Sequence, residues 1–442
     1  TGTNGGVIVL VADDPSMHSS QNEQDSRFYA KFAMIPCLEP SNQQEAYNMV
    51  HFAFDYSESI HLPVLMRVTT RMAHSRAVVE IKETPREQNA LNYEARPNDW
   101  ILLPAMARRR NDIVTSQQTK LEEDAVDSSY NRFIDAADHS LGIIASGIGI
   151  NYLNECYPDG SPFPVLKISH YPLPKKLIRK MTEECDSVLV VEEGQPFIED
   201  ALNGIMPGNA EIKGKLTGDL PRTGELTPDV IKKALKLDVC EGHAKSENTV
   251  PRPPALCKGC GHRDVYAALN DVLKEYPNAR VFGDIGCYTL GALPPYQALH
   301  STVDMGASIT MAKGAADAGQ WPAVAVIGDS TFTHSGMTGL LDAINENSDI
   351  TVIISDNLTT AMTGGQDSAG TNKLEAICRG LGVEEEHLRT VVPLPKNMPE
   401  IEKLIRDEIN YHGVSVIIPC RECMQTLQRH LREKKQKGGQ LG

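Results

Sequence analysis

The chain has 442 residues, more than one hydrophobic core usually takes, so its length favours two or three domains. Its 43 Lys and Arg residues against 58 Asp and Glu residues give a net charge of −15, which argues against nucleic acid as a partner. No stretch reaches the roughly 20 apolar residues that span a bilayer, and the first residues lack the pattern of a signal peptide. We therefore expect a cytoplasmic protein that binds neither membranes nor nucleic acids.

The first third of the chain alternates between apolar and polar segments. Residues 7–12 have the composition of a buried strand, residues 43–54 the spacing of a helix, and residues 63–69 that of a second strand. The polar loop at residues 13–27 is of a length that is usually functional or disordered, and a solvated surface loop is the alternative. Residues 85–140 are charged and irregular, and we interpret them as a connector that wraps two domains.

The rest of the chain alternates regularly between apolar strands and helical stretches. Strands are expected at residues 141–149, 164–169 and 187–194, with a helix at residues 174–184. Residues 241–254 carry Gly and Pro but no apolar period, which marks a linker. After it, helices are expected at residues 263–276, 307–319 and 336–346, and strands at residues 279–284, 322–329 and 350–357. Such alternation predicts an α/β fold of several doubly wound parallel-sheet domains, with ligands at the carboxyl ends of the strands.

A candidate magnesium site follows two of the expected strands. Gly328-Asp329-Ser330 ends one strand, and Asn357 ends the next after 26 intervening residues. One βαβ unit sets such residues side by side. A hard cation needs oxygen ligands, and the Asp329 carboxylate, the Asn357 amide oxygen and the backbone carbonyl of Thr359 supply three, to be completed by two diphosphate oxygens and a water. The pattern resembles the thiamine-diphosphate motif; an Asp and an Asn that end strands by chance are the alternative.

Further motifs narrow this resemblance. The sequence TGGQ, which begins at Thr363, follows the magnesium loop and resembles the 2-oxoacid:ferredoxin oxidoreductases in particular. The helix that opens with DMGAS at residues 304–308 turns its amides outward as a cradle for diphosphate, and an ordinary glycine-containing helix start is the alternative. Five phrases together resemble the large (alpha) subunit of the indolepyruvate:ferredoxin oxidoreductases over essentially the whole chain: ADDPSMHSSQNEQDSR, CKGCGHRDVYAALN, FGDIGCYTLGALPP, GDSTFTHSGMTGL and DNLTTAMTGGQDS.

The resemblance implies an activity, its cofactors and its partners. The activity is oxidative decarboxylation of an aryl 2-oxoacid, indole-3-pyruvate, with CoA to aryl-acetyl-CoA and CO₂, the electrons passing to ferredoxin. The implied cofactors are thiamine diphosphate, Mg²⁺ and a [4Fe-4S] cluster, with CoA as cosubstrate. The implied partners are ferredoxin and a smaller beta subunit, in an alpha2beta2 assembly. The alternatives are a non-oxidative thiamine-dependent decarboxylase or synthase, which needs no cysteine quartet, and a catalytically dead scaffold of the same fold.

The resemblance also implies domains. Residues 1–84 correspond to the C-terminal part of a pyrimidine-binding domain, and residues 85–245 to the connector plus a transketolase-C-like α/β domain. Residues 246–425 correspond to the domain that binds diphosphate and magnesium, and residues 426–442 to a basic tail or linker.

The resemblance also implies individual site residues. Those expected to bind the cofactor are Gly306, Ser308, Gly328, Asp329, Ser330, Asn357, Thr359, Thr363, Gly364 and His262. Those expected on the substrate side are His18, Ser19, Ser20, Gln21 and Asn22, since the matching loop lies near the cofactor in relatives. The family's glutamate that protonates N1′ of the cofactor, and its ferredoxin-like cysteine runs, have no counterpart in this sequence. We expect a fragment at both ends or other chains that supply these parts.

Ten cysteines in a long cytoplasmic chain favour metal, cluster or redox chemistry over a disulfide framework. The resemblance implies that Cys257 and Cys260 of CKGC, Cys287 of GDIGC and Cys420 of VSVIIPC hold the [4Fe-4S] cluster near the thiazolium. A zinc site and unligated or redox thiols are the alternatives, and Cys423 is the rival of Cys420. The others are expected to be structural or incidental: Cys37, Cys156, Cys185, Cys240 and Cys378.

Overall fold

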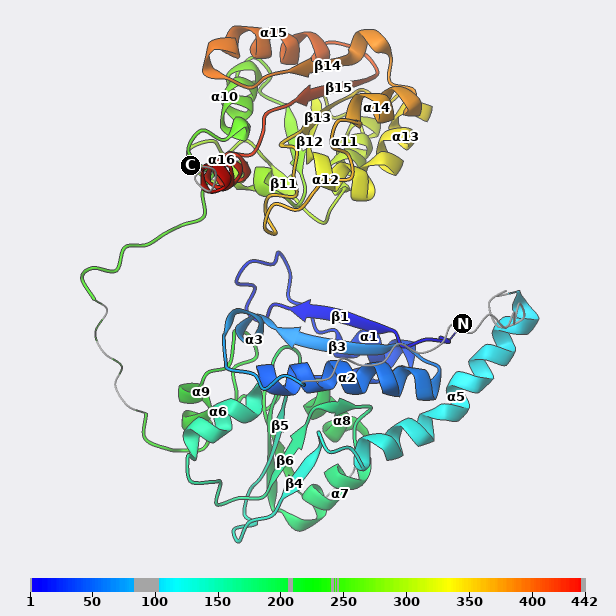
Figure 1. Cartoon of the computed structure of the whole chain (residues 1–442), viewed down its shortest axis with the longest axis vertical. Helices are drawn as coiled ribbons and strands as arrows, with labels where there is room; N and C mark the ends of the chain where they lie inside the picture. Colours follow the sequence, from blue (N-terminus) through cyan, green and yellow to red (C-terminus); the bar gives the residue numbers. More distant parts are fainter. Residues whose placement is uncertain are drawn as a thin grey trace. The chain divides into compact units, whose positions relative to one another are not determined.

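The computed structural model describes residues 2–82, 103–205, 210–239, 242, 244 and 246–438. The chain divides into two compact units, Thr1–Ala244 and Lys245–Gly442, and each is described by itself (Figure 1). Among the described helices, none has the combination of length and apolar composition that a membrane span needs.

The first unit contains two sheets. One has the strand order β1-β3-β2-β7 and the other β4-β6-β5-β8-β9, each mostly parallel with one antiparallel neighbour pair, β2 with β7 and β4 with β6. The elements of this unit are β1 (Ile8–Asp13), α1 (Arg27–Ala33), β2 (Cys37–Leu38), α2 (Gln43–Ile60), β3 (Val64–Thr69), α3 (Thr70–His74), α5 (Pro104–Val126), β4 (Arg132–Ile134), β5 (Gly142–Ser146), α6 (Gly149–Cys156), β6 (Val165–Ile168), β7 (His170–Tyr171), α7 (Lys175–Glu184), β8 (Ser187–Val191), α8 (Phe197–Ile205), β9 (Glu211–Lys213) and α9 (Pro228–Ala234).

The helix α2 illustrates how local sequence sets an element of the first unit. The Asn42 side chain caps it by accepting a hydrogen bond from the Glu45 amide, which satisfies an amide that the helix itself cannot. Its buried residues recur at helical spacing, with Met49, Ala53 and Ile60 in one cluster with strand β3. This face covers the sheet that carries β1 and β3.

One expectation for the first unit was wrong. Residues 104–126 form the helix α5, where we expected irregular connector. The apolar period that would have indicated a helix is missing, because only Leu121 and Ala125 of this helix are buried. The expected boundary between residues 84 and 85 lies outside the described residues.

The second unit is a doubly wound domain around one six-stranded parallel sheet, with the order β11-β10-β12-β13-β15-β14. Its elements are α10 (Gly261–Leu273), β10 (Arg280–Gly283), η1 (Cys287–Ala292), β11 (Ser301–Thr302), α11 (Ala307–Asp317), β12 (Ala323–Gly328), α12 (Asp329–Thr331), η2 (Phe332–Gly336), α13 (Met337–Asn345), β13 (Ile350–Ser355), α14 (Leu374–Leu381), η3 (Glu385–His387), β14 (Leu388–Val391), η4 (Pro395–Asn397), α15 (Met398–Ile409), β15 (Val414–Pro419) and α16 (Met424–Gly438).

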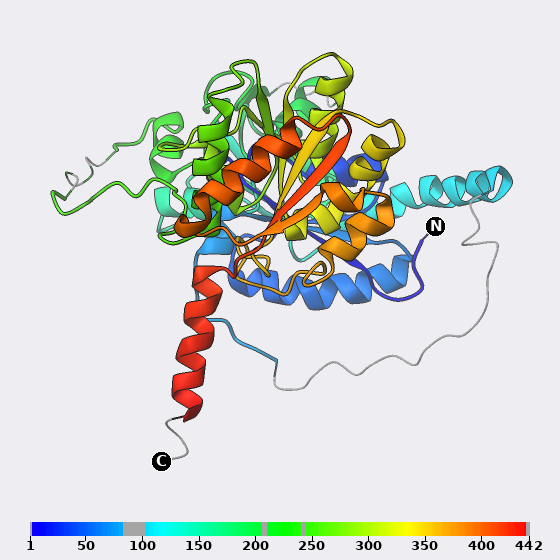
Figure 2. The same cartoon turned by 90° about the horizontal axis from the view of Figure 1, so that it is seen from above.

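Successive strand residues of this sheet serve two cores. Val324 and Val326 of β12 pack with α10 and α15, whereas Ala323, Ala325 and Ile327 pack with α11, α13 and α14 on the opposite face. Helices cover both faces of the sheet, so its strands are continuous apolar runs. Such runs could be predicted as strands from the sequence alone. The expected α/β fold with doubly wound parallel sheets is confirmed. Most of the segment expected as a basic tail is the helix α16, which extends away from the sheet in Figure 2.

Candidate active site

Two neighbouring strands deliver the predicted magnesium ligands to one edge of the sheet. β12 and β13 pair in parallel with Gly328 opposite Ser355, so Asp329 and Asn357 both follow the carboxyl ends of paired strands. Both residues line one cavity of about 150 Å³. Four further predicted residues line the same cavity: Gly328, Ser330, Thr359 and Thr363.

The Asp329 carboxylate is buried and incompletely satisfied. The residue is 2% exposed, and among the described residues its Oδ2 atom has no hydrogen-bond partner. Burial raises the pKa of Asp329 to about 6, and the negative charge of Asp356 adds to this effect. A buried carboxylate oxygen without a donor is unfavourable unless a cation satisfies it. Together with the amide oxygen of Asn357 and the carbonyl of Thr359, it offers the oxygen chemistry that Mg²⁺ requires.

The TGGQ loop closes on itself beside this cavity. The Thr360 amide donates to the Gln366 carbonyl (2.8 Å), and the Thr363 hydroxyl donates to the Gln366 side chain (2.7 Å). Arg429 of α16 donates to the carbonyl oxygens of Gly364 and Gly365 at 3.0 and 3.1 Å. Gly364 does not line the magnesium cavity but a neighbouring one that Arg429 also lines. Arg429 therefore anchors the TGGQ loop to α16 without itself lining the magnesium cavity.

The start of α11 differs from the expected diphosphate cradle. The amides of Gly306 and Ser308 donate to one oxygen of Asp284 at 3.2 and 3.3 Å, and the Ser308 hydroxyl donates to it at 2.6 Å. Gly306 has a φ of 94°, and a Cβ there would lie 2.8 Å from the Ser335 carbonyl oxygen, so glycine serves the turn. The structure does not bring Gly306 or Ser308 to the cavity, because a protein carboxylate already satisfies these donors.

Four cysteines line a second cavity, of about 130 Å³. They are Cys257, Cys260, Cys287 and Cys423. Burial raises the pKa of Cys287 to about 11, and the charges of Cys260, Cys423 and Cys257 follow as causes, which reflects how close the four groups lie. Cys287, Asn357 and Ala361 line both cavities, so the cysteine cavity and the magnesium cavity adjoin.

Cys420 is not among the residues that line the cysteine cavity. Its thiol donates to Asp356 Oδ2 at 3.4 Å, and the two residues form an isolated bridge beyond the ends of β13 and β15. Burial raises the pKa of Cys420 to about 12, and Asp356 contributes further. Three residues later, the Cys423 amide donates to the Asn357 carbonyl at 3.1 Å, which holds Cys423 beside the cavity.

His262 also lines the cysteine cavity. It is 5% exposed, and among the described residues its Nε2 atom has no partner. Burial lowers the pKa of His262 to about 4, so the ring is neutral at pH 7. The Cys260 thiol receives a hydrogen bond from the His262 backbone amide.

The substrate-side candidates lie in the other unit, in the loop between β1 and α1. His18, Ser19, Ser20, Gln21 and Asn22 are exposed at the tip of this loop. The buried carboxylates Asp13, Asp14 and Asp25, at 1 to 7% exposure, lie at its base.

Sequence reasoning missed Asp284, Asp356 and Arg429. Asp284 and Asp356 each follow an apolar strand, so the rule that gave Asp329 and Asn357 could have found them. Arg429 lies in a basic helix. Its partners, Gly364 and Gly365, are distant in sequence, and no local pattern indicates the contact.

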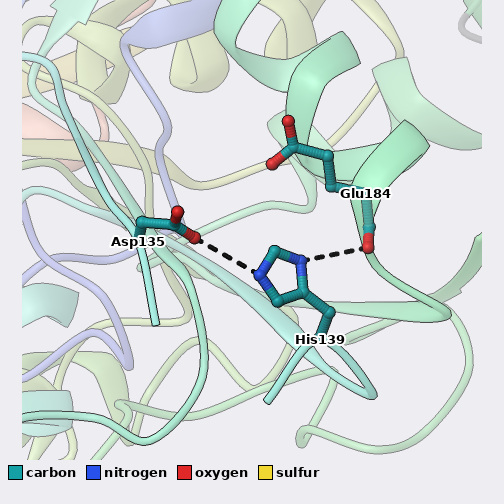
Figure 3. A group of neighbouring side chains, drawn as sticks. All are labelled: Asp135, His139 and Glu184. Carbon is teal, nitrogen blue, oxygen red and sulfur yellow. Dashed lines mark hydrogen bonds and ion pairs between the residues drawn. The ribbon is translucent and has the colours of Figure 1, made fainter. Parts of the chain in front are cut away.

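A separate group of potential metal ligands occurs in the first unit. Figure 3 shows Asp135, His139 and Glu184, whose ligand atoms lie within 4.8 Å of one another. His139 Nε2 faces the Asp135 carboxylate at 3.3 Å, and its Nδ1 faces the backbone carbonyl of Glu184 at 3.2 Å. Protein groups thus occupy both ring nitrogens, and both carboxylates are exposed.

A family profile matches part of the second unit. The family profile described as "Thiamine pyrophosphate enzyme, C-terminal TPP binding domain" matches residues 284–419. The solved structure of a 2-oxoglutarate:ferredoxin oxidoreductase from Magnetococcus marinus is 17% identical, with a TM-score of 0.32 over 42% of this chain and 72% of that one.

Curated relatives align with nearly the whole chain. The chain is 37% identical to "Indolepyruvate oxidoreductase subunit IorA" of Archaeoglobus fulgidus, over 96% of this chain and 71% of the relative. It is 38% identical to the protein of that name from Methanothermobacter thermautotrophicus, over 96% of this chain and 72% of the relative. The Pyrococcus abyssi protein of that name is 36% identical over 96% and 71%. The expected resemblance is confirmed, and the chain belongs to the family of the indolepyruvate oxidoreductase subunit IorA.

Proposed function

We propose that this chain is the thiamine-diphosphate-binding subunit of an enzyme that oxidises indole-3-pyruvate with CoA. The products are aryl-acetyl-CoA and CO₂, and the electrons pass to ferredoxin. The observation that carries the proposal is a buried oxygen of Asp329 that has no partner among the described residues, in a cavity that adjoins the four-cysteine cavity. A thiamine enzyme without redox chemistry would need the first cavity but not the second.

The magnesium edge would hold the cofactor through its diphosphate. Asp329, Asn357 and the carbonyl of Thr359 would bind Mg²⁺, and the self-closed TGGQ loop would hold this edge in one conformation. When bound, thiamine diphosphate supplies the electron sink for loss of CO₂. The chain's own residues orient the diphosphate and keep water from the buried Asp329 carboxylate.

The cysteine cavity would hold the [4Fe-4S] cluster. We propose Cys257, Cys260, Cys287 and Cys423 as its ligands, so that the rival Cys423 replaces Cys420, which the family resemblance implied. The backbone amide of His262 hydrogen-bonds Cys260, and the ring Nε2 of His262, which has no partner among the described residues, would donate to a cluster sulfur. Hydrogen bonds to sulfur raise the reduction potential of such clusters. Cys287, which lines both cavities, would bring the cluster next to the cofactor.

The partners and the location follow from family membership and composition. The curated relatives are named as a subunit, which supports a second chain in the enzyme. We propose that the second chain is a smaller beta subunit, and that the two chains form an alpha2beta2 assembly that uses ferredoxin and CoA. The cytoplasmic location and the domain boundaries remain predictions from the sequence.

The complex with its partner chain is expected to reduce a viologen dye when supplied with indole-3-pyruvate, CoA, Mg²⁺ and thiamine diphosphate. Omission of either CoA or thiamine diphosphate should stop the reaction, because CoA accepts the acyl group and thiamine diphosphate supplies the electron sink for loss of CO₂. Iron and acid-labile sulfide analysis should account for about four of each at this site. Release of CO₂ from the oxoacid by an iron-free complex, without dye reduction, would instead support the non-oxidative alternative.

A further inference from the structure

A third cavity of the second unit lies between the helix α16 and the TGGQ loop, and we call it the α16 pocket. Its volume is about 410 Å³, against about 150 Å³ for the magnesium cavity. Among the described residues, the pocket is lined by Ala361, Gly364, Gly365, Cys423, Gln425, Thr426, Gln428, Arg429 and Arg432. This set contains two arginines and no acidic residue, so the pocket favours an anion.

One face of α16 supplies most of the hydrogen-bond donors of the α16 pocket. The donors recur at intervals of three or four residues, which places them on the same side of the helix: Gln425, Gln428, Arg429 and Arg432. All four residues are exposed to solvent. A guanidinium group donates and cannot accept, and a glutamine amide does both. This face therefore offers a ligand a cluster of N–H groups and two positive charges.

The two positive charges have no carboxylate partner among the described residues. Arg429 donates to the backbone carbonyls of Gly364 (3.0 Å) and Gly365 (3.1 Å), which are neutral acceptors. Gly365 has a φ of 81°, and a Cβ there would lie 2.6 Å from Nη2 of Arg429, so glycine lets the guanidinium pack on the loop. Arg432 makes no hydrogen bond or ion pair with any residue that the structure describes. Like charges at this helical spacing repel, and a bound anion would offset the repulsion.

The α16 pocket adjoins both cavities of the candidate active site. Ala361 lines all three cavities. Cys423 and Gln425 line the α16 pocket and the cysteine cavity, and Nε2 of Gln425 lies 3.7 Å from Sγ of Cys257. A ligand held by the arginines would therefore lie next to the site that we propose for the cofactor and the cluster.

We propose that the α16 pocket binds phosphate groups of CoA, with Arg432 as a main ligand; this rests on the proposed function. Two other anions take part in that function, and neither suits the pocket. The diphosphate of thiamine needs the Mg²⁺ ligands of the magnesium cavity. An aryl 2-oxoacid needs apolar walls for its ring, whereas this lining is polar or glycine apart from the small side chains of Ala361 and Cys423. Guanidinium groups match phosphate oxygens with paired hydrogen bonds, and the flexible arm of CoA would carry its thiol into the adjoining cavity.

The test measures the affinity of the complete enzyme for CoA by calorimetry, without 2-oxoacid, in the wild type, Arg432→Ala and Arg432→Lys. Arg432→Ala is expected to raise the Kd for CoA about tenfold, the scale of one lost hydrogen bond to a charged group. Arg432→Lys keeps the charge but not the planar fork, so it should recover part of the affinity. The KM for CoA should rise in parallel, while the KM for the 2-oxoacid and the kcat at saturating CoA stay unchanged. Arg432 is chosen over Arg429 because Arg429 also anchors the TGGQ loop.

Arg379→Ala is the matched control, since Arg379 is exposed on α14 of the same unit and pairs with Glu385. It removes the same charge and should leave the Kd for CoA unchanged. A wild-type Kd for CoA in Arg432→Ala overturns the inference, and so does a higher KM for the 2-oxoacid or for ferredoxin with no change for CoA. These last two results would assign the pocket to the substrate carboxylate or to the electron acceptor. An enzyme that binds CoA through Arg432 but oxidises no aryl 2-oxoacid would contradict the proposed function and not the pocket.

Discussion

Asp329→Ala is expected to abolish magnesium-dependent binding of thiamine diphosphate and to lower 2-oxoacid oxidation by more than about a hundredfold. The reason is that the Asp329 carboxylate is the charged member of the proposed ligand set, and each 1.4 kcal/mol of lost binding corresponds to about a factor of ten. Among the described residues its Oδ2 atom has no hydrogen-bond partner, so it is available to bind a cation. Calorimetric titration of the metal-free protein with thiamine diphosphate and Mg²⁺ measures the affinity for the cofactor directly.

A structural role for Asp329 would give a different result. Asp329→Asn keeps the shape but removes a buried, incompletely satisfied charge, so the cofactor-free variant should be at least as stable to heat as the wild type. Asp342→Asn is a suitable control, because Asp342 is an exposed carboxylate on α13 in the same unit. If Asp329→Asn binds the cofactor like the wild type, or if Asp342→Asn does not, the assignment of the magnesium edge is wrong.

The core of the second unit could be predicted from the sequence because both faces of its sheet are covered. The segments of β12 and β13 are unbroken apolar runs, and such runs have few other interpretations. Once the strands are placed, the parallel topology alone brings Asp329 and Asn357 to one edge. This step needs no knowledge of side-chain conformation, which is why it could be made in advance.

Contacts that depend on the detailed conformation of the chain could not be predicted in this way. The α11 amino terminus has the glycine and serine of an anion site, but Asp284 supplies the anion from the end of the neighbouring strand β10. The helix α5 has almost no buried face, so its sequence carries no period.

The choice between Cys420 and Cys423 as the fourth cluster ligand could not be predicted for the same reason. The last strand ends at Pro419, and both cysteines lie in the short segment before α16. Sequence spacing treats the two as near equivalents. In the structure, the isolated bridge to Asp356 fixes Cys420, and the chain needs three more residues to reach the cavity.

Cys423→Ser is therefore expected to lose the cluster, whereas Cys420→Ser should keep it. A cluster needs four thiolates around it, and Cys423 lines the cavity with Cys257, Cys260 and Cys287. The Cys420 thiol instead donates to Asp356 Oδ2 at 3.4 Å and does not line this cavity.

Iron and sulfide analysis of the two variants, with EPR spectra of the dithionite-reduced proteins, distinguishes these ligands. Cys423→Ser should contain less iron than the wild type and show no [4Fe-4S] signal, and its dye-reduction rate should fall by more than about a hundredfold because electrons lose their exit. Cys420→Ser should match the wild type in iron content. The pair is internally matched, because the residues are three positions apart and undergo the same exchange of sulfur for oxygen. The opposite pattern would return the fourth ligand to Cys420, and full iron content in both would remove the cluster from this cavity.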